Sequence, residues 1–281
     1  MKNIVKCNYK LLDCGEYEKL EQVGEFIIRR PAPQANWKRK LSTEIWQNYS
    51  ARYKPKQAKW IITTDKKLPD FVFNDISINL KLSPNGQIGI FPEQMVNWQW
   101  VQDIVENSNR DLNILNGFAY TGAATLTVST PTTNVTHIDA ASSSVNWAKH
   151  NAKLSGMENP KIRWIVDDIR TFIKREQNRG VRYDGIILDP PAFGRSKKGI
   201  WKISKDLPEL MSYLNDLLSD TPDFIILSCH DKDFGKPELK KQLMQLNNLK
   251  NGRIETIDLV IKSEQGNDLP AGKCARWRRR K

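Results

Sequence analysis

From about residue 96 onward, short apolar runs alternate with longer segments that carry apolar residues every three to four positions. The short runs are typical of buried strands, and the longer segments are typical of amphipathic helices. Such an alternation builds βαβ units, which join into a mostly parallel sheet. We therefore expect an α/β fold. The expected strands are 112–115, 135–139, 162–166, 183–189, 223–229, 254–261 and 273–277, and the expected helices are 122–129, 142–154, 168–177, 204–218 and 237–249.

The first 95 residues differ from the rest of the chain. Short extended segments at 25–29, 60–62 and 76–82 are separated by stretches that contain proline or glycine. The last of these segments alternates apolar and polar residues, as a half-buried strand does. The sequence therefore predicts a small β-rich N-terminal domain of residues 1–95, followed by an α/β domain of residues 96–281.

Carboxylates follow three of the expected strands. Asp139 ends the second strand, Asp167 and Asp168 follow the third, and Asp189 ends the fourth. The carboxyl ends of parallel strands lie at one edge of the sheet, where open α/β sheets bind ligands. Asp139 is placed to accept hydrogen bonds from ribose hydroxyls, with capping of the next helix as the alternative. Of Asp167 and Asp168, one could accept from an adenine amino group and the other could cap a helix.

The segment Asn116–Gly122 joins the first of these strands to a helix. It lacks the three-glycine pattern that binds the pyrophosphate of a dinucleotide, which disfavours an oxidoreductase. Gly117 and Gly122 still permit the backbone to approach a ligand closely. A row of carboxylates suits a cationic nucleoside, and S-adenosylmethionine carries a sulfonium and an amino group.

The segment Leu188–Gly194 reads Leu-Asp-Pro-Pro-Ala-Phe-Gly and follows a buried apolar run. The two prolines remove two backbone donors and keep the chain extended, so Asp189 and Phe193 project from the end of the strand. A carboxylate can hold an amino group, and an aromatic ring can stack on a planar substrate. The cationic loop 194–202 follows, and it is either a contact for phosphate or a solvated loop.

These motifs together resemble the class I S-adenosylmethionine-dependent methyltransferases, and more narrowly the group that contains the bacterial 23S ribosomal RNA cytosine-C5 methyltransferase and its uncharacterised relatives. The resemblance covers roughly residues 85–281. It implies a Rossmann-like sheet, S-adenosylmethionine as cofactor, and methylation of a base of RNA, with ribosomal RNA first and cytosine C5 as one acceptor. The segment 89–94 also resembles this group, although Glu93-Gln94-Met95 stands where Asp-Gln-Arg is usual.

The resemblance also implies roles for individual residues. Asp139 would hold the ribose, Asp168 the adenine amino group, and Asp189 would lie between cofactor and acceptor as a catalytic residue. The remaining cofactor-binding residues come from the first turn and from the segment before it: Phe118, Ala119, Tyr120, Thr121, Gly122 and Gln94. Asp189 is counted among the cofactor-binding residues as well.

Cys229 ends the expected strand 223–229 and precedes His230. In the cytosine-C5 enzymes a cysteine at the matching place attacks C6 of the base, because C5 becomes nucleophilic only after a thiolate has added. This implies a catalytic role for Cys229. The alternative is a small buried side chain at the end of a strand, which is common for free cysteine.

The net charge of +12 and the pI near 9.5 favour a polyanionic partner such as RNA. Basic clusters lie next to Trp37, Trp201 and Trp277, which could stack on bases or simply pack in their own domain. Methylation of a protein or a small molecule, and a non-catalytic RNA-binding module, are the alternative functions. Four scattered cysteines and three histidines argue against a metal site and for reduced thiols in the cytoplasm, and no signal or membrane segment is expected.

Overall fold

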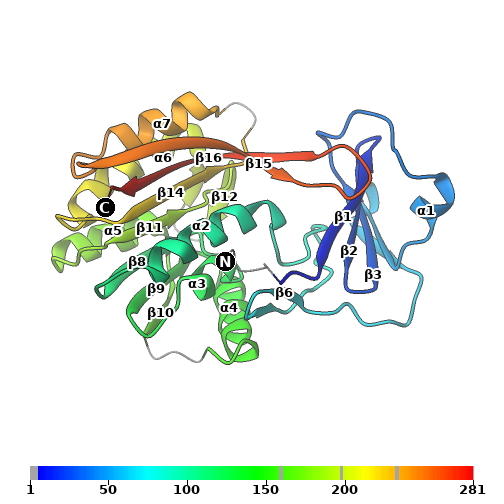
Figure 1. Cartoon of the computed structure of the whole chain (residues 1–281), viewed down its shortest axis with the longest axis horizontal. Helices are drawn as coiled ribbons and strands as arrows, with labels where there is room; N and C mark the ends of the chain where they lie inside the picture. Colours follow the sequence, from blue (N-terminus) through cyan, green and yellow to red (C-terminus); the bar gives the residue numbers. More distant parts are fainter. Residues whose placement is uncertain (1–5, 158–160, 197–198, 232–233, 281) are drawn as a thin grey trace. The chain divides into compact units, whose positions relative to one another are not determined.

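The computed structural model of the chain describes residues 6–157, 161–196, 199–231 and 234–280. It divides into two compact units (Figure 1). The first contains residues up to Glu93 together with 260–271, and the second contains 94–259 and the residues from 272 onward. The segment 260–271, which the sequence grouped with the α/β domain, therefore belongs to the first compact unit.

The first unit is built on a five-stranded sheet in which the strands follow their order in the chain. The β3–β4 pair is parallel and the other pairs are antiparallel. A separate two-stranded hairpin and short helical turns complete the unit. The bounds are β1 Tyr9–Gly15, β2 Glu18–Val23, β3 Phe26–Pro31, α1 Thr43–Gln47, β4 Ala51–Lys54, η1 Pro55–Gln57, β5 Lys59–Ile62, β6 Phe71–Phe73, β7 Ile76–Ile78 and η2 Pro92–Gln94.

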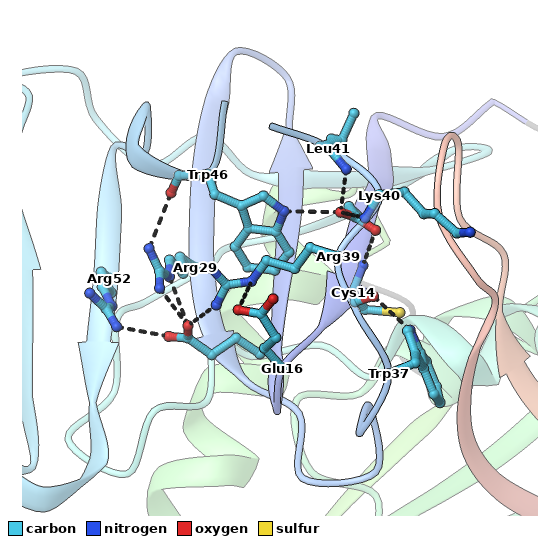
Figure 2. A network of polar contacts seen from close by, with 11 residues as sticks. Cys14, Glu16, Arg29, Trp37, Arg39, Lys40, Leu41, Trp46 and Arg52 are labelled. Carbon is cyan, nitrogen blue, oxygen red and sulfur yellow. Dashed lines mark hydrogen bonds and ion pairs between the residues drawn. The ribbon is translucent and has the colours of Figure 1, made fainter. Parts of the chain in front are cut away.

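Ion pairs cover one part of this sheet (Figure 2). Arg29 and Arg39 donate to one carboxylate oxygen of Glu18 at 2.5 and 2.6 Å, and Arg52 donates to the other at 3.1 Å. The indole of Trp46 in α1 is fully buried, and the Arg39 guanidinium lies 4.0 Å from its ring centroid. The attraction of these arginines outweighs the effect of burial and lowers the pKa of Glu18. Charge-assisted contacts of this kind anchor α1 to the sheet.

A second ion-pair cluster of the first unit is more deeply buried. Glu21 has no exposed surface and accepts from Arg30 at 2.6 and 2.8 Å, from Tyr9 Oη at 2.8 Å, and pairs with Lys19 at 3.1 Å. Burial acts to raise the pKa of Glu21, but Arg30 and Lys19 outweigh it and lower the pKa to about 2. Glu21 is therefore ionised in the folded unit and balances the buried Arg30 and the partly buried Lys19.

The second unit contains the seven-stranded sheet that was expected, in the order β10-β9-β8-β11-β14-β16-β15. The first five strands in this order pair in parallel, and β16 pairs antiparallel with β14. The hairpin β15–β16 supplies residues to both compact units. The strand bounds are β8 Leu112–Gly117, β9 Thr133–Asp139, β10 Ile162–Val166, β11 Gly185–Leu188, β14 Phe224–Cys229, β15 Gly252–Ile261 and β16 Leu269–Arg279, with a two-stranded hairpin of β12 Phe193–Ser196 and β13 Gly199–Lys202.

The strand order places the helices of this unit on both faces of the sheet. The chain runs from β8 through β9 to β10 in one direction and then returns to β11 and β14 in the other. Because such crossovers are right-handed, the helices of the two halves cover opposite faces. Helices α5, α6 and α7 pack side by side, and α2 packs on α3 and β14. The bounds are α2 Met95–Glu106, α3 Ala123–Thr127, α4 Ser142–Leu154, α5 Ile169–Asn178, α6 Ile203–Leu214, η3 Asn215–Leu217 and α7 Lys236–Met244.

Two of the tryptophans beside basic clusters belong to the core of the second unit. Trp201 and Trp277 are 5% and 1% exposed and lie in the main hydrophobic cluster. Trp37 is half-buried and donates from Nε1 to the carbonyl oxygen of Cys14 at 2.7 Å. Packing, the alternative to base stacking, therefore describes Trp201 and Trp277. Residues 197–198 of the expected cationic loop lie outside the described residues.

Candidate functional site at the carboxyl edge of the parallel sheet

The site lies where the strand order reverses, between β8 and β11. Gly117 and Leu188, the last residues of these strands, are direct partners in the ladder. A Cβ atom on Gly117 would come within 2.8 Å of the Leu188 side chain and 3.0 Å of the Ile169 side chain, so the backbone here is packed closely against both. Open α/β sheets bind ligands in the crevice outside the strand ends at this point. The turn after β8 and the Asp-Pro-Pro turn after β11 therefore leave the sheet side by side.

The turn after β8 has an unusual backbone. Phe118, Tyr120 and Gly122 have φ angles of 57°, 48° and 86°. Residues other than glycine rarely adopt such positive φ angles. The turn is closed by Ala119 N–H, which donates to Ile138 O at 3.1 Å, and by Gly122 N–H, which donates to Ala119 O at 3.0 Å. Strained backbone of this kind collects at ligand sites, where the surrounding structure fixes it.

Residues of this turn are held by the neighbouring helix and hairpin. A Cβ on Gly122 would lie 2.9 Å from that of Ala148 in α4, so the turn is packed directly on this helix. Thr121 is buried, and its carbonyl oxygen accepts from Asn151 at 2.9 Å. The ring of Phe118 lies 5.0 Å from that of Trp201. The five residues 118–122 thus form one rigid loop.

Asp139 is held by this loop. One of its oxygens accepts from Tyr120 N–H and the other from Ala141 N–H, both at 2.9 Å. Burial raises the pKa of Asp139, and the bonds to the Ala141 and Tyr120 amides offset only part of this effect. None of the salt bridges among the described residues involves Asp139. Ala141 rather than Asp139 is the N-cap of α4, so the capping alternative is not what the structure shows.

The two carboxylates after β10 have different surroundings. Asp168 is the N-cap of α5, accepts from Arg170 N–H at 3.0 Å and pairs with the Arg170 guanidinium. Burial acts to raise the pKa of Asp168, but Arg170 outweighs it and the pKa is lowered. Asp167 accepts from Asp168 N–H at 2.8 Å and from Arg175, and its own N–H donates to Asp139 O at 3.1 Å. Asp168 therefore takes the capping role, and its contact with adenine stays a prediction.

Asp189 lies at the centre of a group of polar side chains from the second unit. Its Oδ2 accepts from Gln94 Nε2 at 2.9 Å, and its Oδ1 lies 3.1 Å from His230 Nε2. The structure thus brings together Gln94 and Asp189, which the sequence had singled out for different reasons. The contact between Asp189 and His230 was not predicted from the sequence. The only signal for it was that Asp189 and His230 each lie at the end of an expected strand.

Cys229 is a buried residue of the core. Its side chain has no exposed surface and belongs to the main hydrophobic cluster. Burial raises the pKa of the Cys229 thiol, and the sulfur accepts from Asp231 N–H at 3.4 Å. A buried thiol with a raised pKa is a poor nucleophile, because the thiolate is the reactive form. These observations favour the packing alternative for Cys229.

The described residues contain no group of three or more His, Cys, Asp or Glu side chains that could hold a metal ion. In the same part of the chain, no helix is both long enough and apolar enough to cross a membrane.

The fold and this edge of the sheet define a methyltransferase with a Rossmann-like fold. A family model described as S-adenosylmethionine-dependent methyltransferase matches residues 6–246, and the chain belongs to this family. Its cofactor is therefore S-adenosylmethionine, and the resemblance stated from the motifs is confirmed at this level.

Known proteins similar to the chain include solved structures and curated sequences. A crystal structure of the S-adenosylmethionine-dependent methyltransferase from Agrobacterium tumefaciens is 30% identical, with a TM-score of 0.91 over 97% of this chain and 91% of that one. A putative methyltransferase from Streptococcus mutans has the same fold, with a TM-score of 0.75 at 18% identity, over 97% of this chain and 75% of that one. The ribosomal RNA large subunit methyltransferase K/L of Shewanella frigidimarina is 30% identical over 72% of this chain, which spans only 30% of that protein.

Proposed function

We propose that this chain transfers the methyl group of S-adenosylmethionine to a base of ribosomal RNA. The observation that carries the proposal is the carboxylate of Asp189, which is held at the reversal point of the sheet beside the strained 118–122 loop. The names of the curated relatives, which are ribosomal RNA large subunit methyltransferases K/L and I, support RNA as the substrate. The net charge of +12 suits a polyanionic partner.

The residues at the strand ends fit the cofactor. Asp139 accepts hydrogen bonds from neutral donors, and its pKa is raised. Its carboxylate therefore retains the capacity to accept hydrogen bonds from ribose hydroxyls. The loop Phe118, Ala119, Tyr120, Thr121 and Gly122 would surround the methionine part, and Gly122 lets this loop pack directly on Ala148. For the adenine amino group we propose Asp168, with Asp167 as the second candidate.

The bound cofactor supplies an electrophilic methyl group on a sulfonium, so the protein mainly has to align and desolvate the reactants. Asp189 would face the acceptor base and accept a hydrogen bond from it. Cytosine C5 is the acceptor if Cys229 is the nucleophile, and the buried sulfur favours an acceptor that needs no thiolate. We place the enzyme in the cytoplasm, where its RNA substrate is made.

The division into a β-rich domain of residues 1–95 and a methyltransferase domain of residues 96–281 also remains a proposal. Limited proteolysis of the whole chain tests it. Cleavage near residue 95 with both fragments resistant to further digestion supports two independent domains. Protection of that linker, or rapid loss of the N-terminal fragment after cleavage, contradicts this division.

Transfer of tritium from methyl-labelled S-adenosylmethionine tests the function. The purified chain is incubated with total RNA from a strain that lacks its gene, and in parallel with RNase-treated extract. The proposal is supported if label appears in RNA and if the Asp139→Asn variant incorporates less of it. Digestion of the RNA to nucleosides then identifies the methylated base. Label found only in the RNase-treated extract contradicts RNA as substrate and moves it to a protein or a small molecule.

A further inference from the structure

Both oxygens of the Asp189 carboxylate contact a side-chain nitrogen. Gln94 donates to Oδ2 at 2.9 Å, and His230 Nε2 lies 3.1 Å from Oδ1. An ionised carboxylate only accepts hydrogen bonds, so His230 must carry its proton on Nε2. In the neutral ring this leaves Nδ1 as the acceptor nitrogen.

Gly272 on β16 leaves the room that the His230 ring occupies. A Cβ atom at Gly272 would lie 2.9 Å from His230 Nδ1 and 2.9 Å from Cys229 O. The ring is therefore confined on the side opposite Asp189, and a larger residue at 272 would push it out of its place.

The contacts of Gln94 Oε1 favour one orientation of its amide, in which Nε2 also lies 3.5 Å from His230 Nε2. Its Oε1 accepts from Asn97 Nδ2 at 2.7 Å and from Ser228 Oγ at 3.3 Å. Rotating the amide by 180° would place Nε2 against the Asn97 donor and oxygen against the Asp189 carboxylate. Gln94, Asn97 and Ser228 are 7%, 2% and 1% exposed, so water cannot easily take over these bonds.

The orientation of Asn97 is set in turn by a buried charge. Arg276 Nη1 donates to Asn97 Oδ1 at 3.4 Å, and Arg276 pairs with Glu255 at 2.6 Å. The guanidinium also lies 4.7 Å from the centroid of the Trp100 ring. The hydrogen bonds thus run in one direction, from Arg276 through Asn97 and Gln94 to Asp189. We call these four residues and their bonds the Arg276 relay.

We propose that Gln94 and His230 are positioning residues that fix the Asp189 carboxylate for the methyl acceptor, and that the Arg276 relay sets the orientation of Gln94. The inference rests on the proposed function. Each oxygen of Asp189 keeps one further acceptor position, which is aimed by the two donors and receives an N–H group of the acceptor base. Precise aim matters because small displacements of a reacting group cost about 100-fold in rate.

Asn97→Asp tests the relay with little change of volume. It replaces the donor to Gln94 Oε1 by an oxygen, so the Gln94 amide turns and its N–H leaves Asp189. We expect kcat to fall about 100-fold. Asn107→Asp is the matched control, because Asn107 is exposed at the end of the same helix. Equal kcat values for the parent and Asn97→Asp overturn the role of the relay.

His230→Leu and His230→Gln separate positioning from packing. Leucine fills part of the ring's space without a donor, whereas glutamine supplies an N–H for Asp189 Oδ1. We expect His230→Leu to lower kcat about 100-fold and His230→Gln to restore most of that loss. Two variants with the same kcat as each other contradict the positioning role.

A measurement without substrate keeps this inference distinguishable from the proposed function. The chain has three histidines, so the ring nitrogens of His230 can be assigned by ¹⁵N NMR through the loss of its signals in His230→Gln. We expect a proton on Nε2 of the neutral ring. A ring that carries its only proton on Nδ1 overturns the inference, even if RNA is methylated. A ring protonated on Nε2 in a chain that methylates no RNA supports the contact with Asp189 and contradicts the proposed function.

Discussion

Glu18 and Glu21 of the first unit and Asp139 of the second have opposite surroundings. In the first unit, Glu18 and Glu21 are surrounded by arginine and lysine, and both pKa values are lowered. In the second unit, Asp139 accepts from backbone amides at the strand ends, and its pKa is raised. In the first arrangement, cationic side chains of the protein balance the charge of the carboxylate. In the second, the carboxylate is desolvated and accepts hydrogen bonds from neutral donors alone.

This difference separates structural carboxylates from those available to a ligand. A buried charge with a complete set of partners stabilises its own surroundings, and removing one partner leaves the others unpaired. A desolvated carboxylate without a cation costs stability, and such costs are typical of binding sites.

The largest expected effect belongs to Glu21. Glu21→Gln leaves the buried Arg30 and the partly buried Lys19 without the carboxylate that contacts them, and we expect a loss of about 3–5 kcal/mol in the free energy of unfolding. Denaturant titration measures it. Glu25→Gln is the control, because Glu25 forms an exposed ion pair with Lys66 and should leave the unfolding midpoint unchanged. Equal midpoints for the two variants would contradict a structural role for Glu21.

Acid should remove the same contribution without a mutation. Glu21 has a folded pKa of about 2 against an ordinary 4.5, so its stabilisation is fully present above pH 4.5 and is lost as the pH falls through 2. The difference corresponds to about 3 kcal/mol. The sign is reversed for Asp139, whose raised pKa makes the fold more stable as it becomes protonated. Unfolding curves of the parent and Glu21→Gln should converge between pH 4.5 and 2, and a constant gap would contradict the assignment.

Asp139→Asn tests the contact with the ribose. The amide keeps one acceptor oxygen but turns its NH2 toward the other backbone N–H, which loses its acceptor, so we expect a loss of about 1–3 kcal/mol in the free energy of unfolding. Loss of charge-assisted bonds to the ribose should weaken S-adenosylmethionine by about 1.5–3 kcal/mol, or about 10- to 150-fold in Kd. Calorimetric titration measures the affinity. An unchanged Kd for S-adenosylmethionine would contradict the contact between Asp139 and the ribose.

Cys229→Ala has the smallest expected effect. The side chain is buried in the hydrophobic cluster, so truncation should cost about 1 kcal/mol of stability and leave methyl transfer within about twofold of the parent. The tritium assay and a thermal melt measure the two quantities. Loss of all transfer with intact cofactor binding would restore Cys229 as the nucleophile and cytosine C5 as the acceptor.

Much of the second unit could be predicted because its elements have clear periods. The strand 162–166 and the helix 142–154 agree with β10 and α4 at both ends. Helix α2 was missed because it begins after Gln94, which has helical backbone angles and makes no side-chain cap. In the first unit, β1 and β2 were missed because they bury Asp13 and Glu21, which breaks the apolar alternation.

Only part of the site could be predicted from the sequence. Asp139 and Asp189 could be found because each directly follows an apolar run. The contact of Asp189 with His230 joins residues 41 positions apart, and that with Gln94 joins residues 95 positions apart. Sequence spacing carries no information on such pairs, and the division of roles between Asp167 and Asp168 depends on which side chain reaches Arg170.

The segment 260–271 determines when the first unit can be completed during synthesis. It is joined to the N-terminal strands by a bridge between Leu11 and Ser263 and by hydrogen bonds to Cys14 Sγ and Gln34 Nε2, over separations as large as 253 residues. At about 5–20 residues per second, a ribosome needs on the order of 10–50 seconds to add that stretch. The strands β1–β5 are therefore made long before the segment 260–271 that completes their unit, and in that interval β1 lacks its contact with this segment.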